Sequence, residues 1–215
     1  MNSKTEKFLL KGAAGAIEVQ RDSPSGSPPV GVAVIAHPHP LFGGTMDNKV
    51  VQTLARAFVS CGWTAVRFNF RGVGASEGAH DEGRGEAQDM LGVIEQVAAQ
   101  GELAIAGFSF GAFVSSHVVS TLWETRQPRQ IVLVGTAAAR FSVAEVPAAA
   151  HDRTLVVHGE HDDTVPLSAV LDWARPQILP VTVVPGGGHF FHGQLPLLKS
   201  LVTRHLRAGD VSSAS

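Results

Sequence analysis

The chain has a single cysteine, Cys61, and therefore no internal disulfide, which is compatible with a reducing compartment. Its 17 lysines and arginines against 19 aspartates and glutamates give a net charge near −2 and no basic excess for nucleic acid. No apolar run reaches the roughly 20 residues that cross a bilayer, and we expect no signal peptide, because residues 1–7 are polar. We expect a cytoplasmic protein whose partners include neither nucleic acid nor membrane.

One domain is the simplest organisation for a chain of this length and composition. Hydrophobic residues make up 44% and charged residues 17% of its 215 residues, as in soluble globular proteins with a substantial core. We find no internal repeat and no linker. We therefore expect a single domain over residues 1–207, followed by a polar C-terminal tail at 208–215.

Short apolar runs alternate with amphipathic segments. The run 30–36 has no polar alternation, which is typical of a strand buried on both faces of a sheet. Further strands are expected at residues 8–10, 16–20, 63–70, 103–106, 130–135, 154–158 and 181–184. Helical spacing predicts helices at residues 48–59, 84–100, 112–123, 167–175 and 196–206. The alternation predicts an α/β fold with a mostly parallel sheet and helices on both faces.

Ser109 lies in a Gly-x-Ser-x-Gly motif, residues 107–111, between a predicted strand and a predicted helix. In that context the serine occupies a sharp turn that exposes its hydroxyl at the sheet edge. Gly107 and Gly111 are expected because a Cβ atom at either position would collide with the neighbouring strand or helix. The helix that follows directs its first N–H groups toward any negative charge that forms beside Ser109.

Two further polar residues follow strand ends, where the functional residues of parallel sheets gather. Asp162 follows the strand at 154–158, and His189 follows the strand at 181–184 in a loop with three glycines. A serine hydroxyl is a weak nucleophile that needs a base, and the base needs a third group that orients it. The chain supplies these groups in the order serine, acid, histidine.

Five motifs, which follow one another along nearly the whole chain, resemble in sequence and order those of small bacterial serine esterases of the α/β-hydrolase superfamily. They are His-Pro-His-Pro-Leu-Phe-Gly-Gly-Thr-Met at 37–46, Phe-Asn-Phe-Arg-Gly-Val-Gly-x-Ser-x-Gly at 68–78, Gly-Phe-Ser-Phe-Gly at 107–111, His-Gly-Glu-x-Asp-x-x-Val-Pro at 158–166 and Gly-x-His-Phe-Phe at 187–191. The resemblance implies an α/β-hydrolase fold with an eight-stranded sheet whose second strand is antiparallel. It also implies a catalytic triad of Ser109, Asp162 and His189.

The implied activity is hydrolysis of carboxylic esters or thioesters of small soluble substrates through an acyl-enzyme on Ser109, with no cofactor. An acyltransferase with the same triad and a non-catalytic binding protein with this fold are the alternatives. Nothing in the sequence specifies an oligomeric state.

An oxyanion hole needs two N–H donors. The backbone N–H of Phe110, which follows the nucleophile, is one. The second should come from the loop 37–44, where Pro38 and Pro40 have no N–H to donate. Leu41 and His39 both retain one, and we favour Leu41.

Several nearby residues compete for these roles. Asp163 competes with Asp162, but the resemblance implies Asp162, because the family's Gly-x-x-Asp spacing from Gly159 falls on it. His192 competes with His189 and is interpreted as a surface or pocket-rim residue. A zinc site built from His37, His39, His158, His161 and His192 is an alternative, but no zinc-ligand spacing is present and we expect no metal. We interpret Arg71 as tying its loop to neighbouring carbonyls. Asn69, where relatives often have aspartate, is interpreted as structural.

The interval 136–153, where many α/β-hydrolases carry a lid, is too short for a helical cap. We therefore expect an open, shallow pocket and a preference for short-chain esters. Phenylalanines near the motifs are expected to wall it, namely Phe42, Phe108, Phe110, Phe190 and Phe191.

Overall fold

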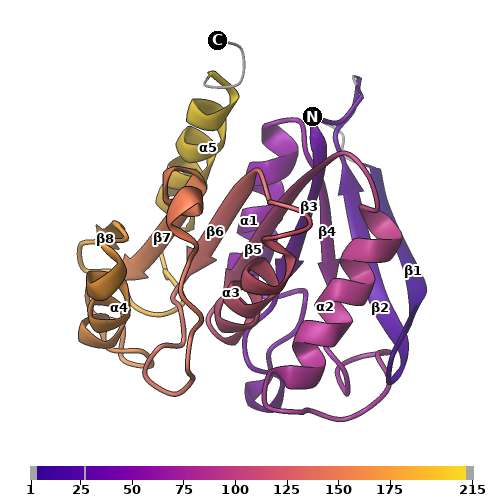
Figure 1. The fold of residues 1–215 in the computed structure, drawn as a ribbon, viewed down its shortest axis with the longest axis horizontal. Coiled ribbons are helices and arrows are strands. Elements are labelled where there is room, and N and C mark those ends of the chain that lie inside the picture. The colour runs from indigo at the N-terminus through magenta and orange to yellow at the C-terminus, as the bar shows by residue number, and fades with distance from the viewer. Residues whose placement is uncertain (1–3, 27, 212–215) are drawn as a thin grey trace.

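A sheet of eight strands crosses the part of the chain that this computed structural model describes, residues 4–26 and 28–211 (Figure 1). The strands are β1 (Lys4–Gly12), β2 (Gly15–Ser23), β3 (Gly31–Ala36), β4 (Thr64–Phe68), β5 (Glu102–Phe108), β6 (Gln130–Val134), β7 (Thr154–Gly159) and β8 (Val181–Val184). They lie in the order β1-β2-β4-β3-β5-β6-β7-β8. Strands β3 to β8 run parallel, whereas β2 is antiparallel to both β1 and β4. The expected sheet is confirmed.

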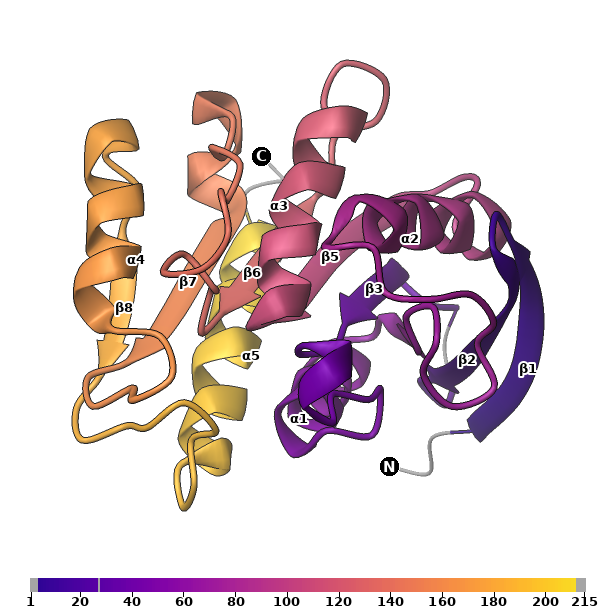
Figure 2. The ribbon, with the colours of Figure 1, turned by 90° about the horizontal axis from the view of Figure 1, so that it is seen from below.

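Helices cover both faces of the sheet, as the view in Figure 2 shows. On one face lie α2 (Arg84–Val97), α3 (Phe110–Leu122) and α4 (Leu167–Ala174), and on the other lie α1 (Lys49–Ser60) and α5 (Leu195–Val211). The adjacent residues Val34 and Ile35 of β3 belong to different core clusters, because successive strand side chains point to opposite faces. This double burial explains why the sequence of β3 lacks polar alternation.

The C-terminal boundary differs from the sequence-based expectation of a polar tail from residue 208. Helix α5 continues to Val211, and only residues 212–215 of that tail lie outside the described residues. His205 Nε2 lies 3.3 Å from the carbonyl of Arg153, and a Cβ atom on Gly209 would lie 2.0 Å from the Gln130 side chain. Contact with the starts of β6 and β7 thus stabilises the last turns of α5, although the local sequence there does not favour a helix.

The segment between β6 and β7 contains no helical cap. Its only helix is the short 3₁₀ helix η2 (Ala148–Arg153), and two further 3₁₀ helices, η1 (Pro40–Phe42) and η3 (Arg175–Gln177), lie elsewhere in the described chain. The segment is held down against α3 and α4, because Ala144 N–H donates to Ser116 Oγ and Trp173 Nε1 donates to the Ala144 carbonyl. The prediction that no cap covers the site is confirmed.

Within the described residues, no helix combines the length and the apolar character needed to cross a membrane. Cys61 is only partly buried, at the C-terminal end of α1.

Candidate active site

Ser109 occupies a strained turn between β5 and α3. Its φ of 57° and ψ of −117° lie in a region that residues with a Cβ atom rarely adopt. The turn is held because Ser109 N–H donates to the Val134 carbonyl at 2.8 Å. A Cβ atom on Gly107 would lie 2.3 Å from the Gly111 carbonyl oxygen, and one on Gly111 would lie 2.4 Å from that of Ala36. Both glycines are therefore required by close backbone approach, as the motif predicts.

One imidazole connects the serine to the predicted acid. His189 Nε2 lies 3.0 Å from Ser109 Oγ, and His189 Nδ1 lies 2.7 Å from Asp162 Oδ2. A carboxylate only accepts hydrogen bonds, so Nδ1 carries the proton and Nε2 is left to accept from the serine hydroxyl. The three side chains come from the ends of β5, β7 and β8, and all three are buried. The structure thus brings the three predicted residues together.

The two competing residues lie elsewhere. Asp163 is exposed, and its carboxylate accepts a hydrogen bond from its neighbour Thr164 at 3.3 Å. His192 is exposed and its ring contacts Phe190. Neither reaches Ser109 or His189.

The loops that carry Asp162 and His189 are packed against each other. His161 N–H donates to the Gly187 carbonyl at 2.8 Å, and a Cβ atom on Gly159 would lie 2.4 Å from the same oxygen. The His189 ring also packs against Phe108, with 4.9 Å between ring centroids. These contacts fix the orientation of the imidazole.

Asp162 is surrounded by donors. Its Oδ1 accepts from Thr164 N–H at 3.0 Å and from Val165 N–H at 2.7 Å, while Oδ2 faces His189. Burial acts to raise the pKa of Asp162, but the hydrogen bonds from His189 and Val165 N–H outweigh burial and leave this pKa below its ordinary value. The carboxyl group is therefore an anion at neutral pH.

The backbone N–H groups expected to form the oxyanion hole differ in whether they already have an acceptor. Leu41 N–H donates to His39 Nδ1 at 3.2 Å and is thus engaged, whereas the N–H groups of Phe110 and His39 have no acceptor in the described part of the chain. Phe110 is the first residue of α3, where the N–H groups have no partner within the helix. Of these two candidate donors, only His39 N–H is without an acceptor in the described residues, so we favour it over Leu41.

Comparison with known proteins agrees with this fold. A model of the X-Pro dipeptidyl-peptidase (S15) family matches residues 17–145, more than half of the chain. The chain belongs to this family of α/β hydrolases. The matched residues include Ser109 but neither Asp162 nor His189.

Solved structures extend the likeness over the whole hydrolase. An α/β serine hydrolase without a lid from Xanthomonas campestris is 33% identical, with a TM-score of 0.85 over 97% of this chain and 96% of the other. An α/β serine hydrolase homologue from Coxiella burnetii is 38% identical, with a TM-score of 0.79 over 94% and 97%. An uncharacterised protein of Rickettsia prowazekii is 42% identical over 118 residues, which span 53% of this chain and 49% of that relative.

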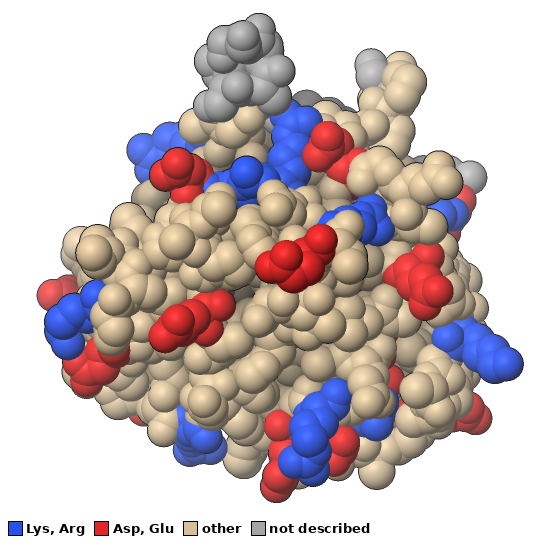
Figure 3. Space-filling model, viewed as in Figure 1, with Lys and Arg blue, Asp and Glu red and all other residues tan. Residues whose placement is uncertain are grey.

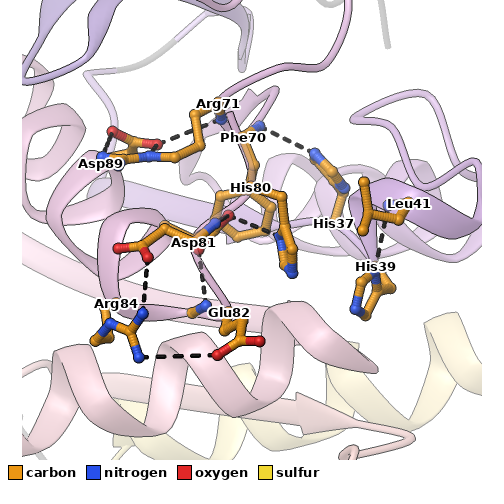
Figure 4. A network of polar contacts seen from close by, with 12 residues as sticks. His37, His39, Leu41, Phe70, Arg71, His80, Asp81, Glu82, Arg84 and Asp89 are labelled. Atoms are coloured by element: carbon orange, nitrogen blue, oxygen red, sulfur yellow. Dashed lines mark hydrogen bonds and ion pairs between the residues drawn. The ribbon is translucent and has the colours of Figure 1, made fainter. Parts of the chain in front are cut away.

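Two of the histidines considered as zinc ligands are structural in this hydrolase. His37 is buried, donates from Nδ1 to the Pro38 carbonyl and accepts the Phe70 N–H at 3.0 Å, so it joins the loops after β3 and β4 (Figure 4). Burial lowers the pKa of His37 to about 4. His158 is buried as well, and its Nε2 lies 2.8 Å from the Val165 carbonyl. The described residues contain no group of three His, Cys, Asp or Glu side chains that could hold a metal ion.

Arg71 pairs with a carboxylate rather than with the carbonyls expected from the sequence. Its Nε and Nη2 donate to the two oxygens of Asp89 on α2, each at 2.8 Å, and both side chains are largely buried (Figure 4). This pair fixes the loop after β4 against α2.

Asn69 has a structural role and requires an amide. Its Oδ1 accepts from Met46 N–H and its Nδ2 donates to Glu18 Oε2, both at 2.8 Å. An aspartate here would place a second carboxylate against Glu18.

The expected phenylalanine wall is only partly present. Phe108, Phe110 and Phe191 are buried in the core, whereas Phe42 is 72% and Phe190 is 43% exposed. A cavity of about 690 Å³ lies beside Phe110 and is lined by His39, Leu41, Phe42, His80, Glu82, Phe113, His117, Arg140, Phe141 and Ser142. Sequence analysis missed its polar lining, because His80, His117 and Arg140 lie outside the recognised motifs.

Proposed function

We propose that this hydrolase cleaves carboxylic esters or thioesters of small soluble molecules through an acyl-enzyme on Ser109. The observation that carries the proposal is the single imidazole of His189, which lies 3.0 Å from Ser109 Oγ and 2.7 Å from Asp162 Oδ2. A weak hydroxyl nucleophile, a base and an orienting anion are thereby in contact.

In the first half-reaction, Ser109 Oγ attacks the ester carbonyl carbon while His189 Nε2 takes the hydroxyl proton. The ionised Asp162 stabilises the imidazolium that results. The oxygen of the tetrahedral intermediate accepts hydrogen bonds from Phe110 N–H and His39 N–H, and the N-terminus of α3 favours its negative charge. His189 then returns the proton to the leaving oxygen or sulfur, and the alcohol or thiol departs.

In the second half-reaction, water replaces the leaving group. His189 takes a proton from the water, whose oxygen attacks the acyl carbon, and the same donors hold the second tetrahedral intermediate. Return of the proton to Ser109 Oγ releases the carboxylic acid and restores the enzyme. No cofactor is required at any step.

Labelling of Ser109 with a fluorophosphonate probe tests the nucleophile and distinguishes an enzyme from a binding protein with this fold. Ser109→Ala and His189→Ala should lower kcat by on the order of 10⁴ to 10⁶, and Asp162→Asn somewhat less, with a retained fold by circular dichroism. Asp163→Asn is the matched control and should leave kcat nearly unchanged. A larger loss from Asp163→Asn than from Asp162→Asn would overturn the assigned acid.

A panel of 4-nitrophenyl esters tests the substrate class. Because no cap covers the site, each exposed CH₂ of a long chain forfeits about 0.8 kcal/mol of binding, and kcat/KM should favour acetyl and butyryl esters over long-chain esters. Added alcohols that outcompete water as acceptors would indicate the acyltransferase alternative. Preferential hydrolysis of Ala-Pro 4-nitroanilide over all esters would contradict the proposal.

A further inference from the structure

The cavity beside Phe110 is at the same edge of the sheet as Ser109. Its His39 ring lies 4.8 Å from the ring of Phe110, the residue that follows the nucleophile. Two other cavities lie at the opposite edge of the sheet. One is lined by Glu102 and Gln130, at the starts of β5 and β6. The other is lined by Asp22, which pairs with Ala65 near the start of β4. Of these three cavities, the one beside Phe110 is therefore at the sheet edge that carries Ser109.

Two N–H donors in this cavity lack protein acceptors and flank one aromatic ring. His39 Nδ1 accepts from Leu41 N–H, so the neutral ring carries its proton on Nε2, which has no partner in the described residues. The exposed guanidinium of Arg140 lies 5.6 Å from the centroid of the Phe42 ring, and within the described chain it makes neither an ion pair nor a hydrogen bond. The His39 ring lies 4.8 Å from the same Phe42 ring.

The other titratable side chains of the cavity have neighbours other than Arg140. Glu82 lies 3.8 Å from Arg84, whose closer partner is Asp81 at 2.9 Å (Figure 4). His80 Nδ1 lies 2.9 Å from Glu86 Oε1 but forms no hydrogen bond within the described residues. His117 Nε2 lies 2.8 Å from the Ser142 carbonyl. Arg140 thus forms no ion pair within the described residues, although the Glu82 carboxylate also lines the cavity.

The surrounding surface does not supply a broad field of either sign. Figure 3 shows acidic and basic side chains interspersed among large uncharged areas on the face that carries α2, α3 and α4. An anion would therefore be recognised here by local donors.

We propose that this cavity binds a carboxylate of the substrate, so that the preferred esters are those that carry a carboxylate group. The inference rests on the proposed function. Arg140 supplies the charge, His39 Nε2–H supplies a second donor, and the exposed Phe42 ring packs against the body of the substrate. A substrate with a terminal ammonium group, such as a dipeptide, would instead face the unpaired guanidinium.

Matched ester pairs test the proposal on both sides of the ester bond. Mono-4-nitrophenyl adipate against 4-nitrophenyl hexanoate varies the acyl group, and 4-acetoxybenzoate against 4-acetoxybenzamide varies the alcohol. For at least one pair, kcat/KM of the wild type should favour the anionic ester, and Arg140→Gln should lower that ratio about five- to tenfold. Arg56→Gln removes an equal charge at the opposite edge of the sheet and should leave the ratio unchanged.

Calorimetric titration with 4-hydroxybenzoate and adipate, against 4-hydroxybenzamide and adipamide, measures the same preference without turnover. The site is supported if one anion binds more tightly than its amide, and if Arg140→Gln abolishes this preference while Arg56→Gln retains it. This result would hold even if the wild type hydrolysed no ester and the proposed function failed. The site would be overturned if Arg140→Gln left the anionic-to-neutral ratios of kcat/KM unchanged and each anion bound no more tightly than its amide. If the enzyme still hydrolysed the neutral esters, the proposed function would stand.

Discussion

His158 Nε2 lies 3.3 Å from Asp162 Oδ2, the same oxygen that faces His189. Both side chains are buried, and burial lowers the pKa of His158, so this second imidazole is neutral. Its Nε2 also lies 2.8 Å from the Val165 carbonyl, while Val165 N–H donates to Asp162 Oδ1. Because the Nε2–H bonds to the Val165 carbonyl, His158 acts on the carboxylate through Val165 and is a positioning residue for the acid.

His158→Phe should lower kcat about tenfold with little change in KM, because the Val165 carbonyl loses its donor and the turn that holds the Asp162 carboxylate is less firmly fixed. His158→Gln retains a donor and should recover part of the loss. Thermal melts of both variants separate this effect from unfolding. Wild-type kcat in a folded His158→Phe variant would contradict the positioning role.

His39→Pro and His39→Ala form a matched pair that tests the second oxyanion donor. Because His39 has a φ of −52°, close to the value that proline imposes, His39→Pro removes the N–H with little change of the backbone. Both variants lose the imidazole, so their ratio isolates the N–H. We expect kcat of His39→Pro to be about 10²- to 10³-fold below that of His39→Ala. Equal kcat values for the two variants would show that another N–H group is the second oxyanion donor.

Ser109→Gly should be more stable than Ser109→Ala, because only glycine adopts a φ of 57° with a ψ of −117° without strain. Relief of about 1 kcal/mol would raise Tm by about 2–4 °C in a domain of this size. Both variants lack the nucleophile, so the comparison is independent of activity. An equal or lower Tm for Ser109→Gly in scanning calorimetry would show that the turn stores no such strain.

Stability should fall as the pH drops from 7 to 4.5. The pKa of His37 is about 4 when folded and 6.5 ordinarily, so in this interval the unfolded chain binds a proton that the folded chain does not. The stabilisation is complete above the unfolded pKa and is lost toward the folded one, a change of up to about 3 kcal/mol. Urea denaturation at both pH values measures it.

His37→Gln provides the control for this pH dependence. The variant should be less stable at pH 7 but should lose less stability on acidification. Part of the dependence should remain, because burial also lowers the pKa values of His158 and His205. An unchanged pH dependence in His37→Gln would remove His37 as the cause.

The sequence by itself determined the fold class and the three residues brought together at the site. Apolar runs without alternation mark strands covered on both faces, and the glycines around Ser109 mark a turn with no room for a Cβ atom. These signals are local and lie within a few residues of the groups they position. The carboxyl-edge rule then indicates the loops that carry Asp162 and His189, because it depends only on the end of each strand, while the choice of Asp162 over Asp163 came from the motif spacing of the family it resembles.

Tertiary structure alone decided the features that depend on contacts between distant segments. Helix α5 extends to Val211 because it packs against the starts of β6 and β7, whereas its local sequence is typical of a tail. The engagement of Leu41 N–H depends on how the loop after β3 folds back on His39. Arg140 and His39 meet at Phe42 only because the segment after β6 packs against α3, a long-range contact that no local pattern encodes.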